Sequence, residues 1–274
     1  MSVAVLCLVL LAALMHAAWN ALIKQANDRL FMMSAMSAVG IPAGLAFLPW
    51  AAAPAEASWP YLALTTAIHA GYYLFLLRAY RIGDLSQVYP IARGGSPLLL
   101  ALASGPLIGE RLSAQQYGGV ALISLGLASL SLGRGHPRAI LYALGTACFI
   151  AAYSAVDALG VRLSESALGY IAWLWLLDGA MMIGFSTAYR RRPFLSFLAA
   201  EWKQSLFAGL LAVAGYSIVV WCYGIGTVAP ISALRETSVV FAALIGTIVL
   251  KEPFGLRRVI AATTVASGIL VMNL

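Results

Sequence analysis

The side chains best able to do chemistry in this sequence are charged groups placed deep inside apolar runs. Arg93 lies eight residues into the run 85–107, with Tyr89, Ser96 and Pro97 at positions i−4, i+3 and i+4 on the same helix face. A guanidinium fork matches the geometry of a carboxylate or a phosphonate. We therefore predict that Arg93 binds an anionic solute, with Tyr89 and Ser96 beside it. The alternative is a structural ion pair with an acid on another helix.

A second charged pair occupies nearly the equivalent place in the C-terminal half. Arg235 and Glu236 lie seven and eight residues into the run 228–250. Adjacent residues on a helix point about 100° apart and do not face each other. We therefore expect Glu236 to pair with Arg93 and to leave Arg235 free for an anion. The alternative is a closed network of all three charges that only fixes packing.

Asp157 is the candidate proton carrier. His16 and Asn20 align with Tyr153 and Asp157 when the segment Ala-Trp-Asn-Ala-Leu is matched with Ala-Val-Asp-Ala-Leu, and each pair shares a helix face. A carboxylate inside a membrane can take up and release a proton. We predict proton coupling by Asp157, with His16 as a second candidate. The alternatives are that Asp157 reaches the membrane interface and that His16 is a hydrogen-bonded packing residue.

Further polar and aromatic side chains are candidates for the wall of one shared cavity. His69 has Tyr72 and Tyr73 at i+3 and i+4, a spacing that suits a polar and aromatic wall. Asp178 carries a weaker signal. The remaining residues predicted to line or flank the site are Trp19, Asn20, Tyr153, Trp175 and Tyr216.

Prolines interrupt the two runs that carry the charges. Pro90 and Pro97 lie in 85–107, and Pro230 lies in 228–250. A proline removes a backbone donor, and broken helices at matching places in two repeats point to a binding site near the membrane midplane. We predict that these three prolines are hinges, the alternative being kinks that the helices tolerate.

The composition shows what must position these side chains. The chain has 274 residues, of which 62% are hydrophobic and 10% charged, with a mean hydropathy of +0.90, whereas about 25% of a soluble domain is charged. A soluble protein of this length could not cover so much apolar surface. Most of the chain therefore faces lipid.

Several other functions are excluded. The net charge of +7 comes from basic residues in short gaps between apolar runs, which indicates contact with anionic lipid heads and not with nucleic acid. Cys7, Cys148 and Cys222 have no metal-ligand spacing and are expected to be small buried hydrophobes. The sequence lacks the signatures of metalloproteases, ATPases, dinucleotide enzymes and serine hydrolases. We expect no enzyme activity, metal or cofactor.

Apolar runs recur along the whole chain. A helix needs about 20 mainly apolar residues to cross a bilayer, and the first run lacks the basic start of a signal peptide. We predict an all-α membrane fold of ten transmembrane helices, with the cavity between the first, third, fourth, sixth, eighth and ninth. The predicted spans are 2–22, 31–50, 59–78, 85–107, 114–132, 139–160, 167–187, 204–223, 228–250 and 256–273.

The halves 1–133 and 139–274 repeat each other. Tyr-Arg-Ile-Gly-Asp-Leu-Ser at 80–86 resembles Tyr-Gly-Ile-Gly-Thr-Val-Ala at 223–229, and the Gly83-to-Glu110 spacing of 27 matches the Gly226-to-Glu252 spacing of 26. Five spans per half is an odd number, so the halves are predicted to be inverted.

The charges agree with inverted halves. With this arrangement 13 of the 17 Lys and Arg residues fall on one side, and only Arg111 and Arg162 fall on the other. The positive-inside rule then places the central loop in the cytoplasm and both termini outside.

These features together resemble the drug/metabolite transporter superfamily in its EamA branch. The resemblance rests on ten spans in two halves, on Gly83 to Glu110 and Gly226 to Glu252, and on the stretch from Gly226-Thr227-Val228-Ala229-Pro230 through Lys251-Glu252-Pro253. It covers nearly the whole chain and implies solute transport by alternating access, often efflux. The proline-rich and glycine-rich segment around Arg93 departs from many relatives. So do the expected outside termini.

We therefore predict a secondary-active transporter of a small metabolite in the inner membrane. The solute is expected to be anionic or zwitterionic, such as an amino acid, an organic acid or a phosphonate, because arginines lie in the predicted site. Its expected partners are this solute and membrane lipids. The alternatives are a passive channel, a non-transporting receptor and, as the least favoured, an intramembrane enzyme.

Overall fold

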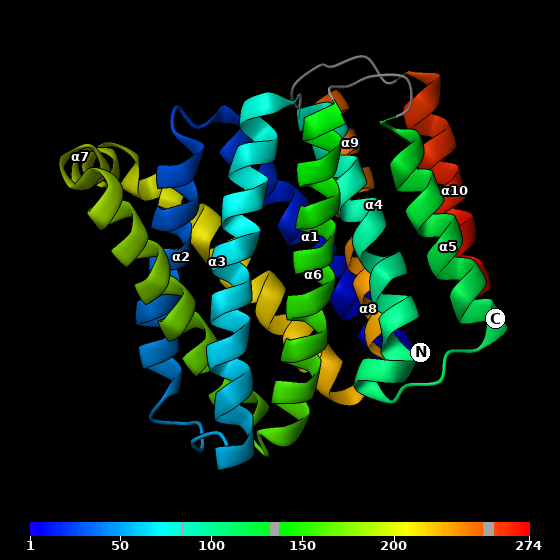
Figure 1. Ribbon diagram of the computed structural model, residues 1–274, viewed down its shortest axis with the longest axis horizontal. Coiled ribbons are helices and arrows are strands. Elements are labelled where there is room, and N and C mark those ends of the chain that lie inside the picture. The colour runs from blue at the N-terminus through cyan, green and yellow to red at the C-terminus, as the bar shows by residue number, and fades with distance from the viewer. Residues whose placement is uncertain (84, 132–136, 249–254) are drawn as a thin grey trace.

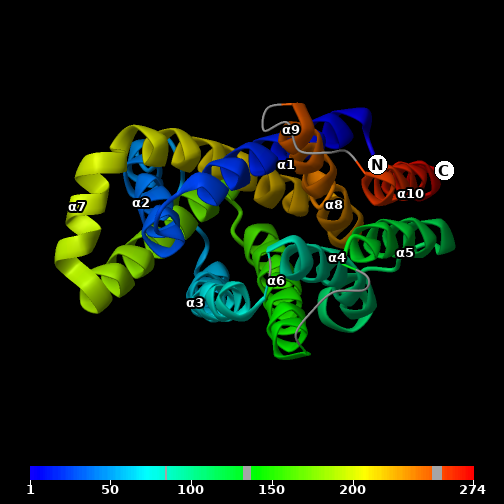
Figure 2. The ribbon, with the colours of Figure 1, turned by 90° about the horizontal axis from the view of Figure 1, so that it is seen from above.

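The computed structural model describes residues 1–83, 85–131, 137–248 and 255–274, and this part of the chain is helical without strands. Figures 1 and 2 show a bundle with the bend of α7 and α2 on one side and α5 and α10 on the other. The long helices are α1 (Val3–Gln25), α2 (Arg29–Phe47), α3 (Trp59–Ile82), α4 (Leu85–Ala103), α5 (Ala114–Ser129), α6 (Pro137–Leu163), α7 (Ala167–Ile225), α8 (Val228–Arg235), α9 (Ser238–Ile248) and α10 (Leu256–Asn273).

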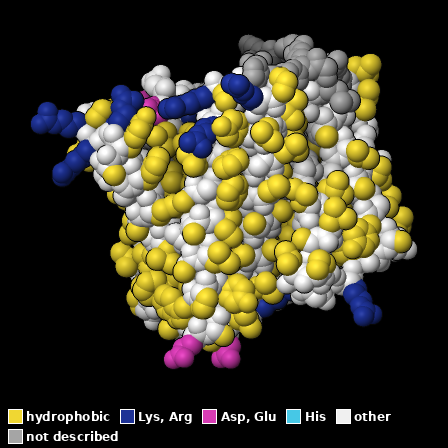
Figure 3. Space-filling view, in the orientation of Figure 1, with side chains coloured by type: hydrophobic (Ala, Val, Ile, Leu, Met, Phe, Trp, Pro, Cys, Tyr) yellow, Lys and Arg dark blue, Asp and Glu magenta, His cyan; other side chains and the backbone are white. Residues whose placement is uncertain are grey.

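Five stretches of the described residues are long and apolar enough to cross a membrane. The surface is apolar too, since Figure 3 shows hydrophobic side chains spread over the middle of the visible face. So large an exposed apolar surface indicates contact with lipid. The five stretches are Val3–Ile23, Arg29–Phe47, Val88–Ile108, Pro137–Leu163 and Ala167–Ile225.

The predicted spans differ from the helices in two places. The spans 167–187 and 204–223 belong to one helical stretch, α7, whose backbone leaves helical geometry only at Arg190 and Glu201. We call residues 167–189 and 202–225 its first and second arms. The span 228–250 is instead divided, because α8 ends at Arg235 and α9 begins at Ser238.

The prolines do not coincide with these breaks. Pro230 is the third residue of α8, where a backbone N–H has no acceptor within the helix, so proline fits without breaking it. The break in this region lies instead at Glu236 and Thr237. Helix α4 continues through Pro90 and Pro97. A break at the prolines is therefore wrong for all three, and a hinge motion there stays a prediction.

The helices pair as two equivalent halves would. Helix α2 packs along α7 and α5 along α10, while α3 packs on α6 and α1 on the second arm of α7. The last two pairs are antiparallel. Gly71 and Gly145 lie against Phe149 and Phe75 in one, and Gln204 and Gly215 lie beside Leu22 and Ala12 in the other. Exchanging the halves maps one pair onto the other.

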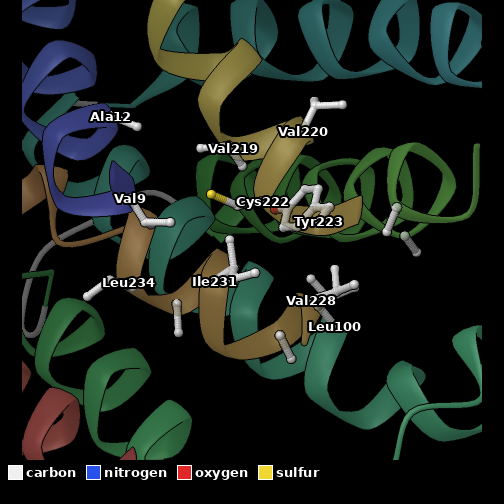
Figure 4. Packing of buried hydrophobic residues seen from close by; sticks show 14 of the residues in the cluster. Val9, Ala12, Leu100, Val219, Val220, Cys222, Tyr223, Val228, Ile231 and Leu234 are labelled. Carbon is white, nitrogen blue, oxygen red and sulfur yellow. The ribbon is translucent and has the colours of Figure 1, made fainter. Parts of the chain in front are cut away.

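An apolar core joins the halves. Figure 4 shows Val9 of α1, Leu100 of α4, Tyr223 of α7 and Ile231 of α8 packed together. All four are buried almost completely. Dispersion contacts of this kind hold membrane helices together where no hydrophobic effect acts between them. This core fixes the positions of α4 and α8, the two helices that carry the central arginines.

The cysteines divide between core and surface. Cys222 is buried in this core as expected, but Cys7 and Cys148 are exposed. Both exposed thiols lie on the outer face of their helices, where lipid would surround them. The prediction of three buried cysteines is therefore wrong for two, because an apolar run does not show which helix face turns outward.

Helices α5 and α10 approach through glycine. A Cβ on Gly119 would lie 2.5 Å from Cβ of Met272 and 2.6 Å from the carbonyl oxygen of Gly268. The neighbouring Gly118 has its nearest contact at 3.8 Å, on Val271. Small residues let membrane helices approach closely. The close approach of α5 and α10 therefore requires that residue 119 has no Cβ, whereas residue 118 has room for one.

We expect Gly119→Ala to destabilise the protein by about 1–3 kcal/mol, the usual cost of overpacking. Gly118→Ala is the matched control and is expected to be neutral or slightly stabilising, because alanine favours the helix. The measurement is the unfolding midpoint in mixed micelles of a denaturing detergent. Equal midpoints for the two variants would show that α5 and α10 do not touch at Gly119.

Candidate functional site

Two arginines and one glutamate form a buried cluster at the centre of the bundle. Arg93 Nη1 lies 3.1 Å from Oε1 and 3.0 Å from Oε2 of Glu236, and Arg235 Nη2 donates to Oε1 at 2.8 Å. Each of the three residues is at most 3% exposed. Two guanidinium groups thus share one carboxylate, and the cluster keeps one surplus positive charge.

The cluster confirms one expected contact and corrects another. Glu236 pairs with Arg93 as expected, but Arg235 also pairs with Glu236 and is not left free of it. The expected 100° separation holds inside a continuous helix. Here α8 ends at Arg235, so the long arginine side chain can reach back to its neighbour at the helix end.

Aromatic rings cover the guanidinium groups. Cζ of Arg93 lies 5.3 Å from the ring centre of Tyr89, and Cζ of Arg235 lies 5.9 Å from that of Tyr153 and 5.8 Å from that of Tyr216. Cation–π contacts within about 6 Å are attractive, more so away from water. These rings hold the arginines in place while leaving their donors available.

The cluster borders a cavity of about 100 Å³, or about 780 Å³ when the open solvent at its mouth is counted. Helices α1, α2, α3, α4, α6 and α8 and both arms of α7 line it. The predicted set of six spans therefore lacked α2 and the first arm of α7. The lining residues are His16, Trp19, Ile23, Met33, Met36, Ser37, His69, Tyr72, Tyr73, Arg93, Tyr153, Leu174, Trp175, Asp178, Ala212, Tyr216 and Arg235.

Stacked rings form one wall of the cavity. His69 lies over Tyr153 with ring centres 4.3 Å apart and an interplanar angle of 18°, and Tyr72 meets Tyr153 edge-on. Trp175 donates a hydrogen bond to Ser217 at 2.9 Å, which fixes its indole. Planar rings fixed in this way offer apolar contact and hydrogen-bonding edges to a solute.

Asp178 is the acidic residue of the cavity lining. It is 5% exposed and comes from the first arm of α7. The hydroxyl of Tyr73 lies 3.5 Å from each of its carboxylate oxygens, and that of Ser37 lies 3.5 Å from the Tyr73 hydroxyl. From sequence, Asp178 is only a weak candidate for the cavity wall. Its depth inside a span, eleven residues from Ala167, is the signal that also marked Arg93.

Asp157 lies outside the lining. It is fully buried, and its two carboxylate oxygens accept hydrogen bonds from the hydroxyls of Tyr170 and Tyr216. The alternative that it reaches the membrane interface is therefore wrong. Through Tyr216 it contacts the cavity wall, and its role in proton coupling stays a prediction.

Other predicted site residues support the lining without forming it. Asn20 donates to the backbone oxygen of His16 at 2.7 Å, and Ser96 donates to that of Arg93 at 3.3 Å. Tyr89 contacts Arg93 through its ring. His16 does line the cavity, with its ring centre 4.3 Å from a ring of Trp19. Binding by any of these residues stays a prediction.

A second polar cluster joins α6, α7 and the start of α8 at one end of the bundle. Glu110 accepts hydrogen bonds from the backbone N–H of Val228, at 3.0 and 3.2 Å, and pairs with Arg162. Arg162 also donates to the backbone oxygens of Tyr223 and Gly226. A carboxylate at a helix start satisfies free N–H groups, so Glu110 fixes the start of α8. Its predicted counterpart, Glu252, lies outside the described residues.

Comparisons with known proteins agree with this architecture. A sequence model of the EamA-like transporter family matches residues 3–132 and again residues 137–274. No curated protein matches the sequence. One solved structure, described only as the crystal structure of a protein, has a TM-score of 0.75 over 97% of this chain and 94% of its own, at 19% identity. That likeness shows a shared fold.

Proposed function

The chain belongs to the EamA-like transporter family, and from that membership we propose that it carries a small anionic or zwitterionic metabolite by secondary active transport. The observation that carries this proposal is the surplus positive charge of Arg93, Arg235 and Glu236 beside a central cavity. A buried cation without its own counter-ion is costly. An anionic group of the solute would supply the missing charge.

Ten membrane crossings in two inverted halves follow from the proposal. Helices α1 to α6, the two arms of α7, the pair α8 and α9, and α10 would provide them. Figure 3 supports the orientation, since Lys and Arg side chains gather at one end of the visible face. By the positive-inside rule that end is cytoplasmic. Both termini would then lie on the opposite, external side of the inner membrane.

Alternating access would require one end of the cavity to be closed in each state. The Glu110–Arg162 cluster ties α6, α7 and α8 together at the end nearer the start of α1. The cavity extends the other way, to Ile23 and Met33 beside the turn between α1 and α2. Two equivalent halves can give two states of similar energy. In the opposite state the Glu110 cluster would separate.

Counterflow tests a carrier against the rival functions. Proteoliposomes loaded with unlabelled succinate, glutamate, methylphosphonate or 6-aminohexanoate are expected to accumulate the same labelled compound transiently for the class that is carried. A carrier that must return loaded shows saturable, counterflow-stimulated flux. A channel would give unsaturated flux without counterflow, and a receptor or an enzyme would give none. Either of those results would overturn the proposal, and liposomes without protein are the control.

A further inference from the structure

Asp178 is a buried carboxylate that takes no part in the cluster of Arg93, Arg235 and Glu236. Arg93 and Arg235 both pair with Glu236, and neither pairs with Asp178. Its contacts with Tyr73, at 3.5 Å, lie at the limit of a hydrogen bond, and Ser37 and His69 are its other polar neighbours. A buried carboxylate without a lysine or arginine among these partners is costly unless a ligand completes its contacts.

A row of rings along the cavity wall connects Arg235 with Asp178. Cζ of Arg235 lies 5.9 Å from the ring centre of Tyr153, which stacks on His69 at 4.3 Å. The ring of His69 lies 6.3 Å from that of Tyr73, whose hydroxyl contacts Asp178. Contacts through three neighbouring rings of the cavity wall therefore lead from the guanidinium to the carboxylate.

The two charged groups also come from different sides of the bundle. Figure 2 shows the bend of α7 on the same side as α2, and α4 and α8 on the other side. Helix α2 packs along α7, and Ser37 of α2 contacts Tyr73 beside Asp178. The cavity lies between, because Asp178, Arg93 and Arg235 all line it. It therefore has a positive wall and a negative wall.

We propose that the cavity takes an extended solute with an acid group at one end and a primary amine at the other. The acid binds Arg93 and Arg235, and the amine binds Asp178, with Tyr73 and Trp175 beside it. An ammonium group donates three hydrogen bonds and is attracted to aromatic faces. The inference rests on the proposed transport function and adds the second charge and the length of the solute.

The length requirement follows from the origin of the two charged groups on different sides of the cavity. In an α-amino acid the amine and the carboxylate share one carbon, so we expect that one molecule does not reach both walls. An ω-amino acid places several methylene groups between the two charges, and these would lie along Tyr72, Tyr153 and Tyr216. Affinity should therefore rise with chain length until the solute spans the cavity.

The test is counterflow of labelled 6-aminohexanoate in proteoliposomes of the full chain. Competitors are glycine, 4-aminobutyrate, unlabelled 6-aminohexanoate and hexanoate, which lacks the amine. We expect 6-aminohexanoate to compete at least about tenfold better than hexanoate or glycine, as for a lost contact to a charged group. In Asp178→Asn the difference between 6-aminohexanoate and hexanoate should vanish. In Asp28→Asn, a helix-cap control outside the cavity, it should remain.

Each outcome has a separate meaning. Because the readout is a ratio within one variant, partial misfolding of Asp178→Asn does not mimic the expected result. Equal competition by glycine and 6-aminohexanoate in the unaltered protein overturns the length requirement, and an amine preference that survives in Asp178→Asn overturns the role of Asp178. Counterflow of hexanoate, succinate or glutamate without 6-aminohexanoate overturns this inference and leaves the transport function standing. Absence of counterflow with every probe overturns both.

Discussion

Glu236→Gln is expected to destabilise the protein by about 3–5 kcal/mol, the usual cost of removing one partner from a buried ion pair. Glu236 is fully buried and is the carboxylate that both Arg93 and Arg235 contact. Its removal leaves two guanidinium groups close together without an anion. The measurement is the unfolding midpoint in mixed detergent micelles, followed by tryptophan fluorescence.

A double variant separates charge from shape. Adding Arg93→Met to Glu236→Gln removes one of the two stranded cations, so the double variant should unfold later than Glu236→Gln alone. Glu56→Gln changes the same chemical group at an exposed position and is expected to have no effect. If Glu236→Gln unfolds at the midpoint of the unaltered protein, the central cluster does not hold the bundle together.

Arg235→Ala and Arg93→Ala are each expected to reduce the kcat/KM of anion transport by roughly 30-fold or more, the factor for a truncated charge contact worth about 2 kcal/mol. Either change leaves Glu236 with one arginine and takes away the surplus charge. The measurement is the initial rate of counterflow over a range of substrate concentrations.

The same variants decide between binding and packing. If the three charges only fix packing, the two alanine variants should lower the unfolding midpoint and leave the substrate affinity unchanged. If the arginines bind the solute, affinity falls in both variants even where the midpoint is preserved. Arg111→Ala is the control, because Arg111 is exposed and lies outside the cavity lining.

Local features of the sequence were enough for much of the fold. The apolar runs that contain α1 to α6 and α10 are visible without any structure, because about 20 apolar residues suffice to predict a helix in lipid. The sequence did not predict that the run 228–250 divides at Glu236. The predicted break was assigned to Pro230 instead, although a proline in the first turn of a helix disturbs no hydrogen bond.

The predicted contact was correct where one charge had one obvious partner. Glu236 was expected to meet Arg93 because both lie deep in equivalent runs, and the structure joins them. Arg235 was expected to stay free, which required a helix that continues past it. Asp178 was ranked low because nothing near it in sequence marks a binding wall, whereas its neighbours in space are Tyr73 and the cavity.

The sequence by itself determined that this chain belongs in lipid, that its halves repeat, and that Arg93, Arg235 and Glu236 lie inside the bundle. These conclusions depend on how each residue interacts with lipid, which is a property of its type and its place in an apolar run. Only the tertiary structure decided that two arginines share one carboxylate and that Asp178 lines the same cavity as they do. Such contacts depend on how helices far apart in sequence rotate and pack, and spacing along one helix does not specify that.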